Sequence, residues 1–179
     1  AFHMNSKEFY SRGINYSNWG FDNYYGLKDM VNYRDNSYML DTELVNNETF
    51  YDLMFHSDKR FVDYIITYSA HMPFNQSKGV CKLILDREKE ASLDSEELEV
   101  LTPQTELTEE DCARLQANET DKMVGLLIQA LRDNNLYDNT VLVVFTDHYL
   151  YTLNDMTILD RYKETDNNLI NHTPFFIWS

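Results

Sequence analysis

The chain has 179 residues, of which 43% are hydrophobic and 14% aromatic, so it can bury the core of one globular domain and lacks the composition of a disordered segment. Its 30 acidic residues outnumber its 15 basic ones and give a formal net charge of -15. That charge argues against non-specific nucleic-acid binding and against attachment to an anionic membrane through charge alone.

The N-terminal part predicts a short strand, a helix, a loop and a second helix. A strand ends near Phe2, and the polar and aromatic residues 5–18 predict a helix after it. Residues 20–40 are rich in Asn, Asp and Tyr with weak periodicity, which indicates a loop. Asp41 is a suitable N-cap for a helix over 42–57, whose apolar residues share one side: Leu44, Phe50, Leu53 and Met54.

The middle of the chain predicts a buried strand and then an acidic insertion. Residues 61–68 are β-branched and aromatic, as buried strands are. Residues 75–117 form the insertion, in which Leu83 to Leu85 is a short strand or a packing patch. Its two cysteines, Cys81 and Cys112, either pair in a disulfide, if the domain is extracellular, or are two unrelated thiols.

The clearest unit is 118–147. Asn118 is a suitable cap for a helix that ends at Asn134-Asn135, and one face of it is apolar at helical spacing: Val124, Leu127, Ile128 and Leu131. Residues 141–145 then form a continuous apolar run, the kind that is buried on both faces of a parallel sheet, and 173–178 looks like another such strand. This alternation predicts an α/β fold with a mostly parallel central sheet.

Histidines follow three of the predicted strands: His3 the first, His71 the second and Asp147-His148 the third. Because ligand sites in open α/β sheets gather beyond the carboxyl ends of the strands, these residues predict one shared site. The carboxylate of Asp147 and the imidazole of His148 are suitable ligands for a divalent ion such as Mn²⁺ or Zn²⁺. A capping Asp beside an exposed His is the alternative interpretation of this pair.

Four segments together resemble one enzyme family. Residues 121–149, with the runs DKMVGLL and LYDNTVLVVFTDH, resemble the metal-binding block of the sulfatase superfamily. The opening AFHMNSKEFYSR, residues 1–12, is similar to the Ala-Phe-His-Gly-Asn…Phe-Trp-Asn-Arg segment of lipoteichoic acid synthases. TYSAHMPF at 67–74 and TPFFIW at 173–178 resemble further segments of that family in the same order.

The resemblance implies a three-layer, alkaline phosphatase-like fold and a role for each matching residue. Asp147 and His148 would bind the catalytic divalent metal, with Mn²⁺ expected first and Mg²⁺ or Zn²⁺ as the other candidates. His3 and Arg12 would contact the phosphoglycerol group, Arg12 as a forked donor to phosphate oxygens. His71 would protonate the leaving group or stabilise charge beside the phosphate.

Two residues depart from the family pattern. Tyr10 stands where Trp usually packs against the glycerol, and Met4 replaces the usual Gly. These departures concern the head group and not the class of enzyme.

The reaction implied is transfer of glycerol phosphate from phosphatidylglycerol to a lipoteichoic acid-type polymer or a glycolipid. The family's threonine nucleophile, which forms the covalent intermediate, lies before His3 in the family pattern and has no counterpart here. We therefore expect 1–179, which begins without Met, to be a single incomplete catalytic domain with 75–117 as an insertion. We expect it to be inactive alone and to bind metal weakly.

The parent protein would be anchored at the outer face of a bacterial cell membrane through segments absent from this chain. Two other functions stay open. One is a sulfatase or phosphodiesterase hydrolase of the same superfamily, which a Cys or Ser nucleophile before Ala1 would indicate in place of Thr. The other is a non-catalytic domain that binds teichoic polymers.

Overall fold

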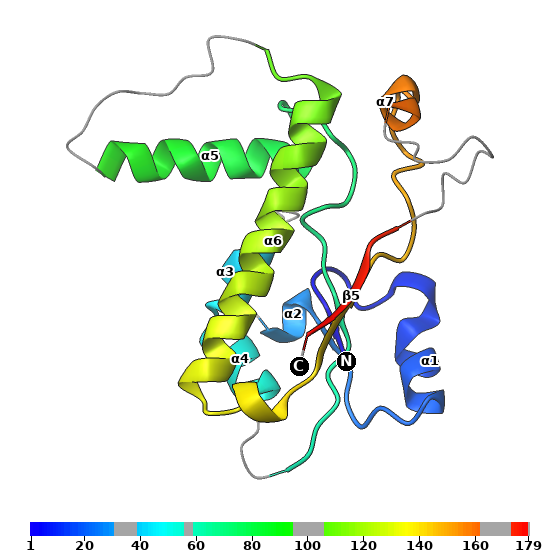
Figure 1. Cartoon of the computed structure of the whole chain (residues 1–179), viewed down its shortest axis with the longest axis vertical. Helices are drawn as coiled ribbons and strands as arrows, with labels where there is room; N and C mark the ends of the chain where they lie inside the picture. Colours follow the sequence, from blue (N-terminus) through cyan, green and yellow to red (C-terminus); the bar gives the residue numbers. More distant parts are fainter. Residues whose placement is uncertain (31–38, 56–58, 95–105, 162–172, 179) are drawn as a thin grey trace.

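The computed structural model describes residues 1–30, 39–55, 59–94, 106–161 and 173–178. The strands are β1 (Phe2–His3), β2 (Tyr25–Gly26), β3 (Ile65–Ile66), β4 (Leu142–Phe145) and β5 (Phe175–Trp178). The helices are η1 (Phe9–Ser11), α1 (Arg12–Asn18), α2 (Leu27–Met30), α3 (Asp41–Val45), α4 (Glu48–Met54), α5 (Gly79–Asp94), α6 (Glu109–Asp133), η2 (Tyr137–Asn139) and α7 (Thr157–Asp160). The long helix α6 runs along the molecule and α5 crosses its upper end (Figure 1).

The N-terminal sheet is parallel, with β1 between β2 and β3. Its central residue Phe2 is 1% exposed and its ring contacts those of Tyr25 and Phe50 at 5.4 and 5.2 Å. Burial of an apolar central strand is expected where helices cover a parallel sheet. The structure therefore confirms the predicted α/β class and the parallel arrangement of these strands.

Short elements are where the sequence predictions were least accurate. β2 and α2 lie in the predicted loop 20–40, whose residues 31–38 are outside the described chain. β2 is held by pairing with β1, through the Tyr25 N–H that donates to the Ala1 carbonyl over 2.9 Å. The predicted strand 61–68 is reduced to Ile65–Ile66. Two-residue strands are fixed by their partners and are too short to show a periodic pattern.

The single helix predicted over 42–57 is two helices, α3 and α4. The break falls at Asn47, whose side chain caps α4 by accepting from the N–H groups of Thr49 and Phe50 at 3.0 and 3.2 Å. The prediction that Asp41 is the N-cap was wrong, because Leu40 occupies that position. The apolar side was predicted correctly: Leu44, Phe50 and Met54 are buried.

Helix α6 begins before the predicted cap Asn118, which lies inside the helix. Thr108 is the N-cap, and its hydroxyl and the Asp111 carboxylate accept from each other's backbone N–H, a reciprocal capping box. The predicted end is confirmed, since Asn134 is the C-cap and Asn135 has a φ of 57°. Within the described residues, no helix is long and apolar enough to cross a membrane.

The described part of the insertion 75–117 is helical and is cross-linked. Cys81 near the start of α5 and Cys112 near the start of α6 form a disulfide, so the first of the two alternatives for these cysteines holds. Leu83 to Leu85 is part of α5 and not a strand, and Ile84 is buried there in a packing patch. Residues 95–105 lie outside the described chain.

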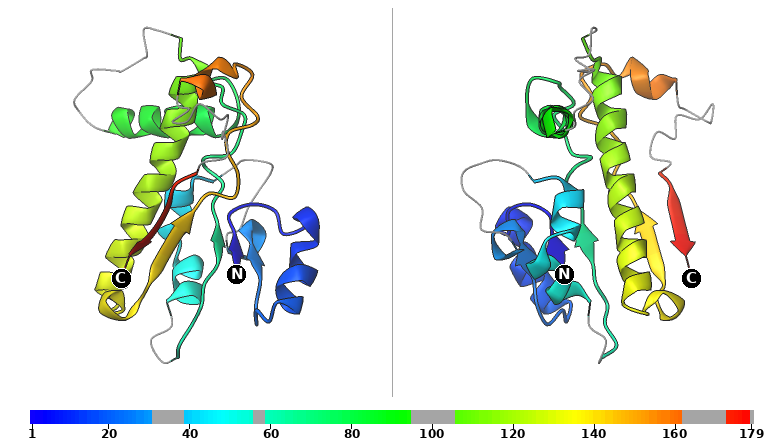
Figure 2. Two further views of the ribbon diagram at one scale, coloured as in Figure 1. Left: turned by 45° about the vertical axis from the view of Figure 1, so that its right-hand side comes forward. Right: turned by 90° about the vertical axis from the view of Figure 1, so that its left-hand side faces the viewer.

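Strands β4 and β5 form a separate antiparallel pair, which Figure 2 shows apart from the three-stranded sheet. The residues of β4 alternate between half-buried and exposed, and those of β5 are exposed. The predictions that 141–145 is buried on both faces and that 173–178 is a parallel strand were therefore wrong for the described chain. Their apolar composition predicted strands correctly but does not encode orientation.

Candidate active site

His3 and Arg12 form a hydrogen-bonded pair at the carboxyl end of the central strand. His3 ends β1 and Arg12 begins α1, and the chain between them turns back on itself. Nη1 of Arg12 donates to Nε2 of His3 over 3.0 Å, and Nδ1 of His3 donates to the Ser6 carbonyl over 2.7 Å. Because a carbonyl only accepts, the neutral imidazole carries its proton on Nδ1 and offers the lone pair of Nε2 to Arg12.

The surroundings of His3 favour its neutral form. Burial lowers the pKa of the imidazole below its ordinary value of 6.5, the hydrogen bond to Ser6 opposes this, and the nearby Arg12 and His71 lower the pKa further. The effect of His71 places it in the electrostatic neighbourhood of His3. At neutral pH, Arg12 is therefore the group of this pair whose charge attracts an anion.

We expect the free energy of unfolding to fall as the pH falls below about 6.5, in part because of His3. Its pKa is lower in the folded state, so the unfolded state takes up the proton first. The stabilisation by the neutral imidazole is complete above the unfolded-state pKa and is lost as the pH falls towards the folded-state pKa. Urea denaturation should show a shallower loss between about pH 7 and 5 in His3→Gln. The same slope in both proteins would contradict this.

Aromatic side chains stand beside the His3–Arg12 pair. Tyr10 has a φ of 55° and its side chain is 80% exposed, while the guanidinium of Arg12 lies 5.2 Å from its ring centroid. The ring of Phe9 is 6.2 Å from the imidazole of His3. The predicted helix 5–18 is thus interrupted at Tyr10, and the interruption leaves an exposed aromatic group next to the cation.

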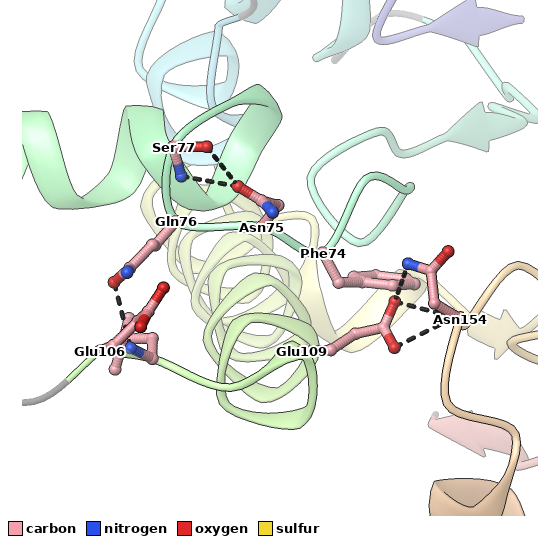
Figure 3. A pocket seen from close by; sticks show the side chains of 8 residues that line it. Phe74, Asn75, Gln76, Ser77, Glu106, Glu109 and Asn154 are labelled. Carbon is pink, nitrogen blue, oxygen red and sulfur yellow. Dashed lines mark hydrogen bonds between the residues drawn. The ribbon is translucent and has the colours of Figure 1, made fainter.

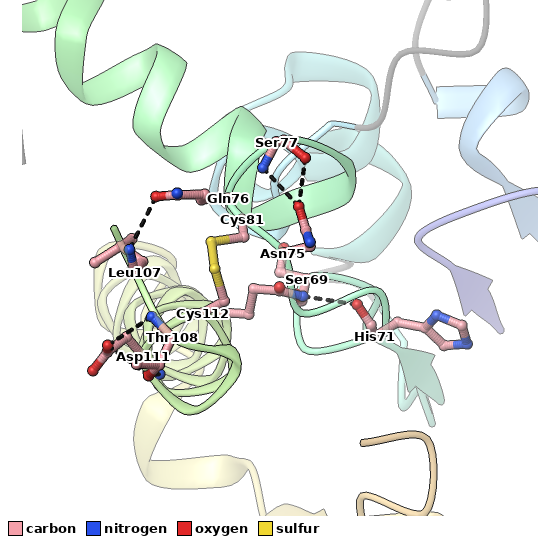
Figure 4. The surroundings of a disulfide bond; sticks show 11 residues. Ser69, His71, Asn75, Gln76, Ser77, Cys81, Leu107, Thr108, Asp111 and Cys112 are labelled. Atoms are coloured by element: carbon pink, nitrogen blue, oxygen red, sulfur yellow. Dashed lines mark hydrogen bonds between the residues drawn. A yellow bond between two sulfur atoms is a disulfide. The ribbon is translucent and has the colours of Figure 1, made fainter. Parts of the chain in front are cut away.

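His71 lies in the loop after β3 and presents an open nitrogen. Its ring stacks on Tyr68 with centroids 5.1 Å apart, and its Nδ1 is 2.8 Å from the Met72 carbonyl. Nδ1 therefore donates, and Nε2 of the neutral ring is left for a ligand. Figure 4 shows the imidazole pointing away from α6 and the disulfide.

Buried polar residues hold the turn before His71, and the sequence analysis did not identify this role. The carboxylate of Asp41 accepts from the N–H groups of Tyr68 and Ser69 at 3.0 and 2.9 Å, and the Asp41 N–H donates to the Ser69 hydroxyl over 2.9 Å. From α6, Nε2 of Gln116 donates to the carbonyls of Ser69 and His71 at 3.0 and 2.7 Å. Gln116 and Glu119 lie on the buried face of α6, which the local sequence did not indicate.

Asp147 and His148 lie just beyond β4 and contact each other. Nδ1 of His148 donates to the Tyr149 carbonyl over 2.8 Å, so that the lone pair of the neutral ring is on Nε2, 3.5 Å from Oδ1 of Asp147. The His148 ring contacts that of Tyr151 at 4.7 Å. The two side chains are 70% (Asp147) and 42% (His148) exposed, so both donor atoms are accessible.

Oδ1 of Asp147 and Nε2 of His148 are placed so that both could bind one divalent ion. Two atoms 3.5 Å apart can each lie about 2.1 Å from one ion, and metal-binding histidines commonly donate their second N–H to a carbonyl, as His148 does to Tyr149. Across the described ranges, no group of three or more His, Cys, Asp or Glu side chains could hold a metal. Asp147 and His148 thus offer two ligands of a site and not a complete set.

The structure brings part of the predicted site together. His3, Arg12 and Tyr10 are in contact, and His71 acts on His3 electrostatically. The hydrogen bonds and ring contacts recorded for Asp147 and His148 are with their own segment. A contact between Phe145 and Tyr64 at 6.4 Å places the end of β4 beside the start of β3.

Two cavities of the described chain lie away from these residues. One of about 300 Å³ is formed by the segment after His71, the start of α6 and Asn154 (Figure 3). Another of about 260 Å³ lies between α3, α4 and the second half of α6. Neither is lined by His3, Arg12, His71, Asp147 or His148, whose predicted common pocket stays a prediction.

Comparison with known proteins identifies the family of this chain. The family model described as Sulfatase matches residues 1–179, and no solved structure matches the chain significantly. The match supports the superfamily and the alkaline phosphatase-like architecture expected from the motifs. It covers the whole chain, including the insertion 75–117.

Proposed function

The chain belongs to the sulfatase family, and we propose that it is part of the catalytic domain of a metal-dependent phosphoglycerol transferase. The observation that carries this proposal is the His3–Arg12 pair. A guanidinium held by hydrogen bonding at the carboxyl end of a parallel sheet, beside exposed aromatic rings, suits a phosphate ester with a small polyol group. The opening motif that supplies these residues resembles lipoteichoic acid synthases.

In this proposal the donor is phosphatidylglycerol, and Arg12 binds the oxygens of its phosphate through the fork of its guanidinium. Nε2 of His3 holds Nη1 of Arg12 at 3.0 Å, which fixes the direction of the fork before the substrate arrives. Preorganised donors of this kind stabilise the charge that develops in the transition state more effectively than mobile ones. Tyr10 packs against the glycerol.

His71 donates a proton to the leaving group. The deprotonated oxygen of a threonine, from the segment where the family places its nucleophile, attacks phosphorus and forms the phosphoglyceryl enzyme. The bond between phosphorus and the diacylglycerol oxygen breaks, and that oxygen takes the proton from Nε2 of protonated His71. A second, reverse transfer passes the glycerol phosphate to a hydroxyl of the growing polymer or glycolipid, which releases the threonine.

Asp147 and His148 are the residues that would hold the divalent metal, Mn²⁺ in the first place. When bound, a divalent ion polarises the phosphoryl oxygens and favours the deprotonated nucleophile. The exposed carboxylate and the lone pair on Nε2 of His148 are oriented for this by the bond from Nδ1 to Tyr149. Since these residues offer two ligands, we propose that isolated 1–179 binds Mn²⁺ no more tightly than micromolar.

The disulfide supports the proposed location outside the cell, because structural disulfides persist in oxidising compartments. Phosphatidylglycerol and the growing polymer are available at the outer face of a bacterial membrane. We propose that segments outside 1–179 anchor the protein there.

Substrate choice tests this function. A form of the protein that includes the segment before Ala1 is incubated with phosphatidylglycerol or an aryl sulfate, with Mn²⁺ or with EDTA. We expect diacylglycerol release with Mn²⁺, loss of release in EDTA, and no sulfate release. Sulfate release without diacylglycerol would favour a sulfatase, release of free glycerol phosphate without polymer growth would favour a phosphodiesterase, and polymer binding without turnover would favour a binding domain.

A further inference from the structure

One face of α6 contacts two of the three segments that carry candidate site residues. Glu109, Cys112 and Gln116 lie at i, i+3 and i+7, so they share this face. We call Glu109, Gln116 and the Cys81–Cys112 disulfide the helix brace. The two segments that it contacts are the His71 loop, residues 69–74, and the metal-pair segment, residues 147–158.

Gln116 holds the His71 loop. Its side chain is fully buried, and its Nε2 donates to the carbonyl of Ser69 at 3.0 Å and to that of His71 at 2.7 Å (Figure 4). One amide therefore fixes two carbonyls on either side of a single residue. This sets the direction in which the chain leaves the turn, and with it the direction of the His71 imidazole.

Glu109 holds the metal-pair segment. Its carboxylate accepts from the backbone N–H of Asn154 at 2.9 Å, from Nδ2 of Asn154 at 2.7 Å and from the N–H of Asp155 at 2.9 Å (Figure 3). Partial burial raises the pKa of this carboxyl, but the hydrogen bonds from Asn154 and Asp155 outweigh it and hold the pKa below its ordinary value. Glu109 is thus an ionised acceptor for the segment that follows Asp147 and His148.

The disulfide lies between these two contacts. Cys81 and Cys112 are fully buried and form one apolar cluster with Phe74 of the His71 loop and with Leu153 and Ile158 of the metal-pair segment. The chain reaches Cys81 shortly after Phe74, through Gly79, whose φ of +68° favours glycine. The disulfide therefore ties the His71 loop to the helix that also holds the metal-pair segment.

We propose that the helix brace positions two parts of the active site, with Gln116 positioning His71 and Glu109 positioning the segment that carries Asp147 and His148. Reduction of the disulfide then weakens both. This inference rests on the proposed function, which places His71 beside the leaving group of the phosphate ester and the metal at Asp147 and His148.

The test compares Gln116→Met, Glu109→Gln and the unmodified chain in the form that includes the segment before Ala1. Gln116→Met keeps the side-chain volume and removes the donor, while Glu109→Gln keeps the size and removes the charge. Gln129→Met and Asp121→Asn are controls at exposed positions of α6. Mn²⁺ affinity is measured by calorimetry, and glycerol 1-phosphate binding by the NMR shift of the His71 imidazole.

We expect each brace variant to change one of the two binding measurements and to leave the other unchanged. Glu109→Gln should weaken Mn²⁺ binding by about 10-fold, the lower end for groups that orient metal ligands, and leave the glycerol phosphate response of His71 unchanged. Gln116→Met should do the reverse. In the unmodified protein, dithiothreitol, which is oxidised as the disulfide is reduced, should weaken both. The inference would be overturned if each variant weakened Mn²⁺ binding and glycerol phosphate binding equally. It would also be overturned if reduction of the disulfide had no effect on either.

Different results would contradict the proposed function and not the helix brace. If His148→Ala does not change Mn²⁺ affinity, or if His71 of the unmodified protein does not respond to glycerol phosphate, the assigned ligands are wrong whatever the brace variants do. If His148→Ala weakens Mn²⁺ binding and His71 of the unmodified protein responds to glycerol phosphate, but the brace variants match the unmodified protein, the brace alone is wrong.

Discussion

Replacing Asp41 with Ala is expected to lower the free energy of unfolding by about 2–4 kcal/mol, because two buried N–H groups would lose their acceptor at about 1–3 kcal/mol each. Asp41 is fully buried and accepts from Tyr68 and Ser69, while the hydroxyl of Thr120 also reaches its Oδ2 at 3.4 Å. Part of the loss is offset, since the variant no longer buries a carboxylate. Burial raises the pKa of this carboxyl, against the hydrogen bonds from Ser69 and Tyr68.

Urea denaturation of Asp41→Ala and Asp41→Asn checks this prediction. Asn keeps one acceptor oxygen, so Asp41→Asn should lose less than Asp41→Ala. Asp52→Ala, at an exposed position of α4, serves as the matched control and should change stability by less than about 0.5 kcal/mol. A loss below about 1 kcal/mol in Asp41→Ala would show that the 68–69 turn finds its acceptors elsewhere.

Because the pKa of Asp41 is raised, Asp41→Asn should change how the free energy of unfolding depends on pH. In the folded state the carboxyl holds its proton to higher pH than in the unfolded state, so the stability of the unmodified chain falls as the pH rises from about 3.8 through the folded-state pKa. Asp41→Asn does not titrate and should lack this fall. The same dependence in both proteins would show that Asp41 is not its source.

Arg12→Ala is expected to lower kcat/KM for phosphatidylglycerol by about 10²–10³-fold, the usual cost of removing one preorganised donor to developing charge. Arg12→Lys should recover only part of this, because a lysine ammonium keeps the charge without the fork. Arg12→Ala also leaves Nε2 of His3 without the donor that lies 3.0 Å from it.

The control for this prediction is Arg132→Ala, which removes a guanidinium that lies over the ring of Tyr137 at 4.6 Å, at the far end of α6. It should leave turnover unchanged. Initial rates of diacylglycerol release separate kcat from KM, and thermal unfolding shows whether each variant is folded. A folded Arg12→Ala with turnover within about twofold of the unmodified protein would remove Arg12 from the site.

The fold was predictable where sequence pattern and packing agree. The run 141–145 became β4, and the apolar spacing over 124–131 marks the buried side of α6. The start of α6 was missed because residues 109–117 are mostly polar or charged, and a helix there is set by the capping box of Thr108 and by the disulfide. The spacing of Thr108 and Asp111 is a local capping signal, which the polar composition after it outweighed, whereas the cross-link is a tertiary contact that local composition does not encode.

Within the candidate site, the contact between His3 and Arg12 was predictable. The motif AFH…SR identified His3 and Arg12, and the structure brings them together. Asp41 shows what local pattern cannot supply: an Asp before an apolar helix predicts a cap, yet its carboxylate turns to a loop far away in the sequence. Gln116 was missed because a glutamine in a helix is ordinarily solvated, and only tertiary packing buries it.

The shared site is tested most directly by a crystal structure with Mn²⁺ and glycerol 1-phosphate, using the anomalous signal of manganese. We expect the ion bound by Oδ1 of Asp147 and Nε2 of His148, and a phosphate that bridges from it to Arg12 and His71. Manganese bound by a different set of ligands would contradict this expectation. So would manganese at Asp147 and His148 with the phosphate bound away from Arg12.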